Sequence, residues 1–395
     1  MKNRLIGFIF LIIITTACQK NLYDETVANI PGTIAVNAAH PMKDSLTAIV
    51  NRHVAKGVPG IQVMVKSPAG WYVVNGGYAR IEDKTPMQDN MVAWLYSLTK
   101  TYTAALTMKL KERSLVALDE PITTYLPADI TQNLVNSDKI TVRMLLNHSS
   151  GFPNFTSLPE FQLRQFNNPF DQQPLLEQLK TAYHKKPRFE PGTDYLYSNT
   201  NYLLLQLIIE KRSGKPYDQF LKEEILQPLA LNKTYYGLTD QQIRSLGFPN
   251  YYFERYNNGQ LENITQWNNA IGKSIEGYGG IAANGTDAIK FLEALNAGKV
   301  VNQTSLKEMR TWIQGKESTV PDYGLGLEYF EYNKGVATYG HEGDNIGATT
   351  QLIYVPASDT YLFISINAGR QIFGQYLFRT TDAKIDLCRF VSKLN

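Results

Sequence analysis

The chain has 395 residues, which is enough for one large domain or two ordinary ones. Hydrophobic residues make up 43% of it and charged residues 19%, an ordinary globular composition. Its 39 basic and 36 acidic side chains give a net charge of +3, and this near-neutral balance gives no sign of a nucleic-acid partner.

The N-terminus is typical of a secretory signal. Lys2 and Arg4 precede an apolar run from Leu5 to Ile14, which is too short to span a bilayer as a stable helix. The following Thr15-Thr16-Ala17-Cys18 resembles a bacterial lipobox, although Thr15 is a poorer match than the usual leucine. We therefore expect residues 1–17 to be a lipoprotein signal peptide. The alternative is a plain signal peptide with an incidental cysteine.

The sequence contains only two cysteines, Cys18 and Cys388. Lipidation of Cys18 would remove an unpaired thiol from an exported protein. Cys388 lies in an apolar-periodic C-terminal helix and is predicted to be a buried thiol. Residues 18–40 are polar and small without periodicity, and we expect them to form a tether. The predicted location is the envelope of a bacterium, with a lipid anchor in the outer membrane or facing the periplasm.

Strand patterns occur at both ends of the chain and helical patterns between them. Ile61 to Lys66 and Trp71 to Val74 predict a hairpin with its turn at Ser67 to Gly70. Helical patterns dominate from Ser97 to Leu229. Later strand-like stretches are Gly324 to Tyr332, Val336 to Tyr339, Gln351 to Val355 and Tyr361 to Ile366, before a final helix from about Gln371 to Leu394. This order predicts one sheet completed by distant segments, with a helical lobe inserted in the middle.

Ser97-Leu98-Thr99-Lys100 opens an apolar-periodic helical stretch, Thr101 to Arg113. Side chains three apart lie on one face of a helical turn, so the Ser97 hydroxyl and the Lys100 amine can share a proton. A serine is a weak nucleophile at neutral pH and needs a base. Desolvation and a nearby helix N-terminus can lower the pKa of a lysine enough for its neutral amine to accept the serine proton. Chance matches to Ser-x-x-Lys are common and mostly solvated, but apolar residues on both sides place this one in a wall of the core.

Two further motifs follow along the chain. Tyr197-Ser198-Asn199 lies between a turn-rich segment and the strongly apolar helix Tyr202 to Ile209. His341-Glu342-Gly343 lies at the edge of the strand-like stretch Thr349 to Val355. Ser-x-x-Lys, Tyr-x-Asn and His-x-Gly in this order resemble the serine β-lactamase and penicillin-binding-protein superfamily, in its class C β-lactamase, D,D-carboxypeptidase and esterase branch. Four flanking segments also match: residues 57–60, 145–151, 279–281 and 323–326.

The resemblance runs from about Met42 to the C-terminus. It implies an α+β fold of the β-lactamase/transpeptidase type, in which terminal helices flank an antiparallel sheet and an all-helical lobe is inserted. We therefore expect a single catalytic domain over residues 41–395. Its sheet part would occupy about 41–96 and 270–395, and its helical lobe about 97–269.

The resemblance also implies the roles of individual residues. Ser97 would be the nucleophile, and Lys100 and Tyr197 would share the role of base, with the choice between them open. Asn199 would hold Lys100 and the substrate carbonyl. The oxyanion hole would consist of the backbone N–H groups of Ser97 and Asp344, and losing one such donor costs about 3 kcal/mol.

The histidines carry different expectations. His341 stands where class C β-lactamases have a lysine and related D,D-carboxypeptidases have a histidine. It would donate to Tyr197 and lose its charge near neutral pH. His148 lies in a segment that resembles a structural loop of the family, and we do not expect it to be catalytic. No metal-ligand spacing links any of the five histidines, so we expect no metal and no cofactor.

The chain departs from the family beside His341. Glu342 replaces the threonine that grips a substrate carboxylate, and Asp344 follows Gly343. Each exposed acid would repel an acidic ligand by about 1 kcal/mol. This repulsion disfavours β-lactams and D-Ala-D-Ala peptides, which carry a carboxylate, and favours esters, amides or substrates with a free amine. Alternatively, Glu342 turns away and bonds a neighbouring backbone group or arginine. Tyr96, where small residues are common, is expected to narrow the site.

The combined prediction is an envelope-anchored serine hydrolase that forms a covalent acyl-enzyme with esters, amides or peptides. Its partner would be a small-molecule or peptide acyl substrate, and we expect a monomer. One alternative is a D-alanyl-D-alanine carboxypeptidase, a penicillin-binding protein or a β-lactamase. Another is a non-catalytic binding lipoprotein on the same scaffold.

Overall fold

A computed structural model of the protein describes residues 34–369 and 375–393. Cys18, the predicted signal peptide and most of the predicted tether lie outside these residues. Seven strands form the main sheet in the order β3-β2-β1-β12-β11-β10-β9, and all neighbouring strands are antiparallel. The strands are β1 (Gly60–Ser67), β2 (Gly70–Arg80), β3 (Thr85–Pro86), β9 (Glu328–Asn333), β10 (Val336–Asn345), β11 (Ala348–Val355) and β12 (Thr360–Ile366).

The sheet joins both ends of the chain, as predicted. The β1–β2 hairpin turns between the paired residues Ser67 and Gly70, and β1 pairs with β12 with Ile61 opposite Ile366. The prediction ended β10 near Tyr339, whereas the strand continues through the His341 motif to Asn345. The glycines and acids of this stretch are poor strand formers, so local propensity gave no sign of the continuation.

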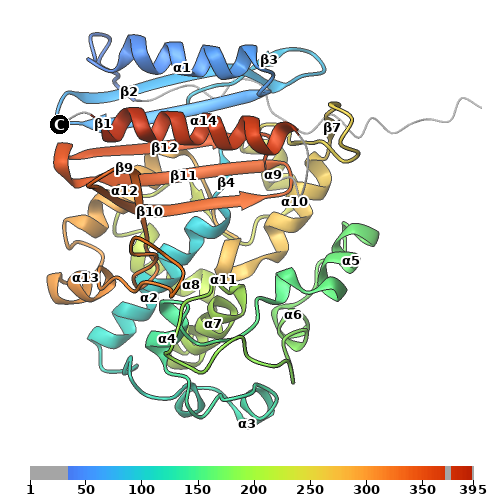
Figure 1. The fold of residues 1–395 in the computed structure, drawn as a ribbon, viewed down its shortest axis with the longest axis vertical. Coiled ribbons are helices and arrows are strands. Elements are labelled where there is room, and N and C mark those ends of the chain that lie inside the picture. The colour runs from blue at the N-terminus through green and yellow to red at the C-terminus, as the bar shows by residue number, and fades with distance from the viewer. Residues whose placement is uncertain (1–33, 370–374, 394–395) are drawn as a thin grey trace, which may run out of the picture.

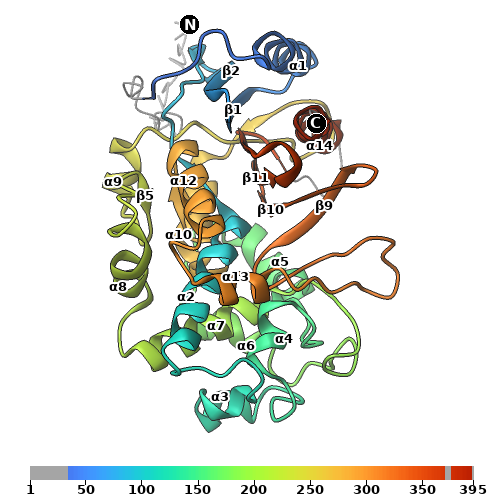
Figure 2. The same cartoon turned by 90° about the vertical axis from the view of Figure 1, so that its left-hand side faces the viewer.

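Helices cover both faces of the sheet. Helices α1 (Lys43–Ala55) and α14 (Gln375–Ser392) lie on one face, and α12 (Gly285–Asn296) lies on the other (Figures 1 and 2). Strand side chains alternate between the faces. Leu362 and Ile364 of β12 therefore belong to the core under α1 and α14, whereas Phe363 belongs to the core shared with the lobe.

The inserted lobe is built mainly of helices. They are α2 (Thr99–Glu112), α3 (Ala128–Thr131), α4 (Val142–Leu146), α5 (Pro159–Asn167), α6 (Leu175–Lys180), α7 (Asn199–Ser213), α8 (Tyr217–Leu221), α9 (Asp240–Ser245), α10 (Thr265–Ser274) and α11 (Glu276–Gly279), with α13 (Gln303–Met309) following α12. The segment also contains two-residue strands, which the expectation of an all-helical lobe did not include: β5 (Thr234–Tyr235), β6 (Tyr252–Phe253) and β7 (Glu262–Asn263). Strand β5 joins β4 (Ala93–Trp94) and β8 (Ala282–Ala283) in a small sheet.

The centre of the lobe is the pair α2 and α7, which pack against each other. Both are largely buried, and their buried residues include polar side chains such as Lys100 and Asn201 as well as apolar ones. Helix α7 is capped by Gly214, whose φ of 69° lies in the left-handed region that glycine adopts without strain. Because α2 begins next to Ser97 and α7 begins at Asn199, these two helices hold two of the predicted motifs.

Within residues 34–369 and 375–393, no helix is long and apolar enough to cross a membrane. The same residues contain no cluster of three or more histidine, cysteine or acidic side chains that could hold a metal ion. Cys388 is buried in α14.

Candidate active site

Ser97 lies in a short 3-10 turn, η1 (Tyr96–Leu98), that leads directly into α2. Two neighbours fix this turn against the small sheet. The N–H of Leu95 donates to the carbonyl of Ile281 at 2.8 Å, and the N–H of Ile281 donates to the hydroxyl of Thr99 at 3.1 Å. The serine is therefore held between two anchored residues at the start of a buried helix.

Tyr96, immediately before the serine, does not narrow the site as expected. Its side chain is buried, and its hydroxyl donates to the Asn268 side chain at 2.6 Å. Its φ of 48° is in the left-handed region, which is uncommon for a large side chain and is a source of backbone strain. The fold therefore keeps a strained residue next to Ser97 and holds it through a buried hydrogen bond.

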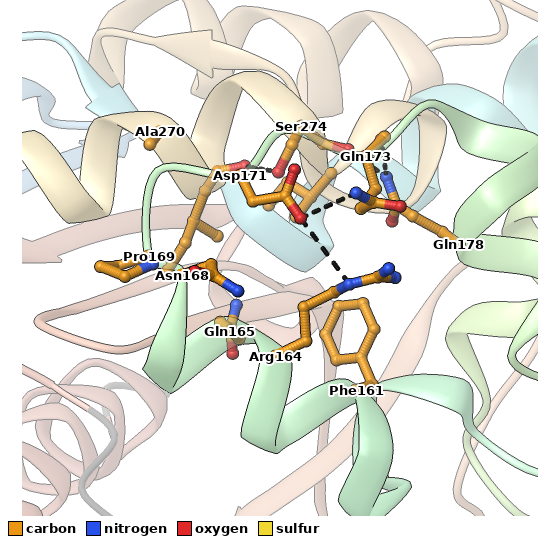
Figure 3. A pocket seen from close by; sticks show the side chains of 12 residues that line it. Phe161, Arg164, Gln165, Asn168, Pro169, Asp171, Gln173, Gln178, Ala270 and Ser274 are labelled. Atoms are coloured by element: carbon orange, nitrogen blue, oxygen red, sulfur yellow. Dashed lines mark hydrogen bonds and ion pairs between the residues drawn. The ribbon is translucent and has the colours of Figure 1, made fainter.

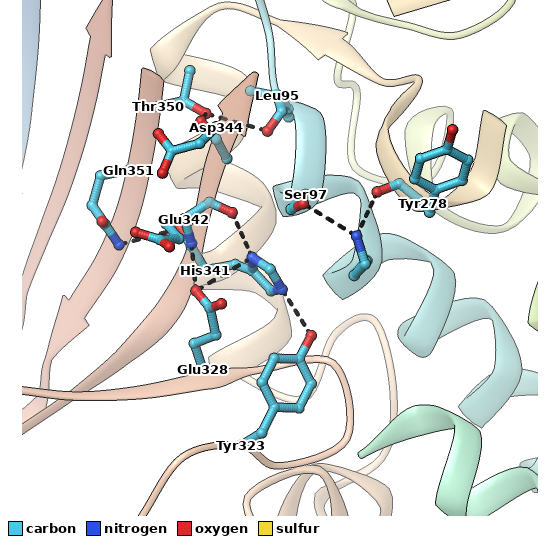
Figure 4. Close-up of polar contacts among 12 residues, drawn as sticks. Leu95, Ser97, Tyr278, Tyr323, Glu328, His341, Glu342, Asp344, Thr350 and Gln351 are labelled. Atoms are coloured by element: carbon cyan, nitrogen blue, oxygen red, sulfur yellow. Dashed lines mark hydrogen bonds and ion pairs between the residues drawn. The ribbon is translucent and has the colours of Figure 1, made fainter. Parts of the chain in front are cut away.

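Lys100 lies on the first turn of α2 and is completely buried. Its Nζ is 3.1 Å from Ser97 Oγ and donates to the Tyr278 carbonyl at 2.8 Å (Figure 4). Burial lowers the pKa of Lys100 well below its ordinary value, and the charge of Glu328 partly opposes this. The amine is thus favoured in its neutral form, which can accept the proton of Ser97.

Three tyrosine rings surround the Lys100 amine. Nζ lies 4.8 Å from the ring centre of Tyr197, 5.5 Å from that of Tyr202 and 5.6 Å from that of Tyr278. The face of an aromatic ring attracts a cation. When Lys100 accepts a proton, the three rings would therefore stabilise the transient ammonium.

Tyr197 lies just before α7, with its ring over Lys100. Its hydroxyl is buried and makes no hydrogen bond with the described residues. Burial raises the pKa of Tyr197 well above its ordinary value, and the nearby Ser97 hydroxyl lowers it by a smaller amount. Between the two candidate bases, the burial of both favours a neutral Lys100 amine and a protonated Tyr197 phenol.

His341 is buried in β10. The expected hydrogen bond from His341 to Tyr197 is not formed, and the two ring centres are 6.3 Å apart. Its Nδ1–H donates to the Glu342 carbonyl at 2.6 Å, so in the neutral ring Nε2 accepts from the Tyr323 hydroxyl at 2.7 Å (Figure 4). Burial and the charge of Lys100 lower the pKa of His341 to about 3. The ring therefore stays neutral around pH 7 instead of titrating there.

Glu328, the first residue of β9, is a member of this site that the sequence prediction missed. Its Oε2 accepts the Glu342 N–H at 2.7 Å and lies 3.5 Å from His341 Nδ1. Burial, followed by repulsion from Glu342, raises the pKa of Glu328 well above its ordinary value. The only sign in the sequence was a carboxylate directly after the apolar Gly-Leu-Gly-Leu segment.

Glu342 and Asp344 point to the α14 side of the sheet, because alternate residues of a strand share a face. Lys384 of α14 donates to Glu342 Oε2 at 2.6 Å and to Asp344 Oδ2 at 3.3 Å. The expectation of two uncompensated acids is therefore wrong. Glu342 does turn to another partner, which is a lysine instead of the backbone group or arginine considered from the sequence.

The edge of β10 lies directly against the Ser97 turn. A Cβ at Gly343 would come 2.1 Å from the carbonyl oxygen of Leu95, so only glycine permits this approach. Pairing with β9 ends at Gly340, and the Glu342 N–H points to this open edge, where Glu328 accepts it. The Asp344 N–H, two residues on, faces the same edge. The assignment of this N–H as an oxyanion donor stays a prediction.

Asn199 does not hold Lys100, although the resemblance implied that it would. Its Nδ2 donates to the Thr156 hydroxyl at 2.9 Å, and its backbone N–H donates to the Asn154 side chain at 3.1 Å. Its Oδ1 is buried without a partner among the described residues. The Tyr278 carbonyl takes the place next to Lys100 that was expected for the amide.

A small hollow, partly open to solvent, lies between α5 and α10 (Figure 3). Arg164, Asp171 and Gln173 line its mouth, and Asp171 contacts both of the others. Gln178 links this hollow to Tyr278, because its side chain accepts a hydrogen bond from the Tyr278 hydroxyl at 2.7 Å. The carbonyl of the same tyrosine accepts from Lys100. Ser97 and Lys100 do not line the hollow.

Comparison with known proteins agrees with the fold and with the family that the three motifs indicate. The chain is 26% identical over 300 residues to penicillin-binding protein 4* of Bacillus subtilis, covering 73% of this chain and 64% of the relative. D-amino acid amidase from Ochrobactrum anthropi has a TM-score of 0.77 at 26% identity and covers 89% of this chain and 99% of the solved one. The octameric penicillin-binding protein homologue from Pyrococcus abyssi has a TM-score of 0.73 at 25% identity, covering 82% and 73%. The family described as Beta-lactamase matches residues 46–375, and this chain belongs to that family.

Proposed function

We propose that the protein is a serine hydrolase that cleaves amides or peptides through a covalent acyl-enzyme on Ser97. The observation that carries the proposal is the fully buried Lys100 amine 3.1 Å from Ser97 Oγ. A neutral amine in that place removes the proton that makes serine a weak nucleophile. The relatives named as amidases and penicillin-binding proteins support an acyl substrate with an amide bond.

The reaction begins when Lys100 accepts the Ser97 proton and Oγ forms a bond to the substrate carbonyl carbon. The N–H groups of Ser97 and Asp344 are the proposed donors to the resulting oxyanion. When the C–N bond breaks, the leaving amine takes a proton, for which we propose the Tyr197 hydroxyl as donor; Lys100 then returns its proton to Tyr197. Water hydrolyses the acyl-Ser97 ester and releases the acid.

Chemical labelling tests this proposal most directly. A fluorophosphonate probe should add one adduct to the intact mass, and Ser97→Ala should lose it. Ser245→Ala, which changes an exposed serine of the lobe, is the matched control and should label normally. A folded protein whose labelling does not depend on Ser97 would contradict the proposal and favour the non-catalytic alternative.

A substrate panel then separates the candidate activities. We expect turnover of p-nitrophenyl esters and of D-amino-acid amides above that of nitrocefin. Labelling by a fluorescent penicillin without ester or amide turnover would favour a penicillin-binding protein. Rapid nitrocefin hydrolysis would favour a β-lactamase.

We also propose that lipid on Cys18 anchors the protein in the bacterial envelope, on the basis of the lipobox-like sequence. For the assembly we propose a monomer. Since one homologue of the same fold is octameric, light scattering of the purified domain is the appropriate measurement.

A further inference from the structure

His148 lies in the loop after α4, next to Tyr197, and has no role in the reaction proposed above. It is completely buried, and its φ of 62° is in the left-handed region. Glycine adopts that region freely, and asparagine, aspartate and histidine are the other residues found there most often. The backbone conformation therefore suits a histidine, and what needs an explanation is the complete burial of its polar ring.

Two hydrogen bonds connect His148 to the backbone on both sides of Tyr197. The N–H of Leu196 donates to the His148 carbonyl at 3.1 Å. The N–H of Ser198 donates to His148 Nδ1 at 3.2 Å. One residue thus accepts from the residue before Tyr197 and from the residue after it.

The partners of the imidazole also define its proton. Nδ1 lies 3.0 Å from the Asn201 amide nitrogen and accepts from Ser198, so both neighbours are donors. The ring is therefore neutral with its proton on Nε2, and this N–H is buried without a partner among the described residues. Burial lowers the pKa of His148 well below its ordinary value, which agrees with a neutral ring.

The imidazole ring also packs against the phenol. Its centre lies 4.4 Å from the ring centre of Tyr197 and 4.7 Å from that of Tyr323, whose hydroxyl bonds His341. The Tyr197 hydroxyl makes no hydrogen bond of good geometry among the described residues, and the Ser97 hydroxyl, which lowers its pKa, is the group that would react. The backbone bond to Ser198 and the close ring packing of His148 therefore help to hold the phenol over Lys100.

We propose that His148 is a positioning residue that holds Tyr197 over Lys100, so that the phenol can pass a proton to the leaving group. This inference rests on the proposed function and adds a cause for the placement of Tyr197. General acid–base groups contribute about 10²–10⁴-fold to a rate, provided that they are held within hydrogen-bond reach. Loss of His148 should therefore have the same kinetic signature as loss of the Tyr197 hydroxyl.

The test uses two variants that both tolerate a positive φ. His148→Asn keeps an acceptor, since its Oδ1 is as many bonds from Cα as the histidine Nδ1. His148→Gly removes the acceptor and the ring without straining the backbone. The two variants therefore differ in the contact to Ser198 and not in backbone compatibility.

The readout is the ratio of kcat/KM for a p-nitroanilide to that for a p-nitrophenyl ester of the same acyl group. An anilide leaving group needs a proton, whereas p-nitrophenolate leaves without one. Tyr197→Phe and His148→Gly should each lower the anilide rate about a hundredfold and the ester rate less than tenfold. His148→Asn should keep the ratio within about threefold of wild type. The double variant His148→Gly/Tyr197→Phe should be no worse than Tyr197→Phe alone, since both changes remove one function.

Equal losses on both substrates, or additive losses in the double variant, would overturn the inference and leave His148 as a general fold contact. If His148→Gly does not fold, His148→Asn decides the question: a folded protein with the ratio of Tyr197→Phe contradicts the proposal. A wild-type protein that turns over neither substrate contradicts the proposed function instead. In that case a crystal structure of His148→Gly with Tyr197 unmoved would still overturn the positioning role.

Discussion

The amine of Lys384 on α14 lies 2.6 Å from the carboxylate of Glu342 on β10. Lys384 also reaches Asp344, so one buried cation compensates both acids that follow His341. An acidic substrate approaching this strand would therefore meet a partly neutralised cluster instead of two free charges. This changes the expected effect of Glu342 on substrate choice.

Replacement of Glu342 by threonine should have little effect on the preference between acidic and neutral substrates. Because Glu342 is paired with Lys384 and faces away from His341, we expect the ratio of kcat/KM for nitrocefin to that for p-nitrophenyl acetate to change by less than about threefold. A tenfold change corresponds to about 1.4 kcal/mol on the transition state. A change of that size would show that the charge of Glu342 reaches the substrate despite Lys384.

Loss of Lys384 should destabilise the fold. Lys384→Met leaves Asp344, whose side chain is 17% exposed, beside Glu342 without their cation. Removing one partner of a buried ion pair costs about 3–5 kcal/mol, and we expect about 3 kcal/mol because water screens the 41% exposed Glu342. Urea denaturation measures the loss. Lys180→Met, from an exposed pair with Glu177, is the control and should cost less than about 1 kcal/mol.

The pH dependence of that loss has a defined sign. Burial lowers the pKa of Lys384, but the two acids outweigh it and raise the pKa above its ordinary value. A raised pKa of a base stabilises the fold fully below the unfolded value, about 10.4 for lysine, and the stabilisation is lost as pH rises through the folded value. The difference between wild type and Lys384→Met should therefore be constant from pH 7 to 9 and shrink only above about pH 10. A difference that disappears near pH 7 would contradict the assignment.

Tyr323→Phe should weaken both stability and activity. It removes the donor to His341 Nε2 and leaves a buried acceptor unpaired, which costs about 1–3 kcal/mol. Since the His341 ring then keeps only the Nδ1–H bond to the Glu342 carbonyl and loses the bond that holds its other nitrogen, we expect kcat/KM to fall about tenfold. Tyr256→Phe, at a side chain that is exposed, should change neither quantity. A Tyr323→Phe protein equal to wild type in urea denaturation and in kcat/KM would argue against a role for this bond.

Membrane attachment should depend on Cys18. The mature chain is predicted to begin there with a lipid, so Cys18→Ala should prevent lipoprotein processing and shift the protein from the membrane fraction to the soluble one. Cell fractionation with intact-mass measurement of the N-terminus checks this. Cys388→Ala is the control for loss of a thiol without loss of the lipobox. A Cys18→Ala protein that is processed normally and remains in the membrane would contradict the prediction.

Local patterns predicted the parts of the molecule whose geometry is itself local. The three-residue spacing of Ser97 and Lys100 places both on one helical turn, and two strand-like stretches joined by a short turn predicted the β1–β2 hairpin. The contacts that tune the site join distant positions. Lys100 meets Tyr278, and Glu342 meets Lys384, only after the whole sheet and lobe have formed. No spacing in the sequence reveals such pairs.

The resemblance to a family was also insufficient where a side chain has a choice of partners. Asn199 matches the expected motif but bonds Thr156, because a hydroxyl lies within reach of its amide. Glu328 illustrates the opposite case. A single acid in a strand is usually solvated, and only the tertiary structure shows that this one is largely shielded from water beside His341, with 14% of its side chain exposed.

Glu328 should control the pH at which the enzyme becomes active. Acylation requires a neutral Lys100, so kcat/KM should rise with pH as this amine loses its proton. Burial lowers the pKa of Lys100, and the negative charge of Glu328 raises it. Glu328→Gln removes that charge and should shift the acidic limb of the pH profile to lower pH, because the ammonium loses a stabilising neighbour.

Glu331→Gln provides the matched control, since it removes the same charge from β9 at a position three residues away, on the other face of the strand. We expect Glu331→Gln to leave the acidic limb of the pH profile at the same pH as in the wild type. Profiles of kcat/KM for a p-nitrophenyl ester, measured on both variants from pH 5 to 10, make the comparison. A limb that moves to higher pH in Glu328→Gln, or that moves equally in both variants, would mean that Lys100 is not the group whose deprotonation activates Ser97.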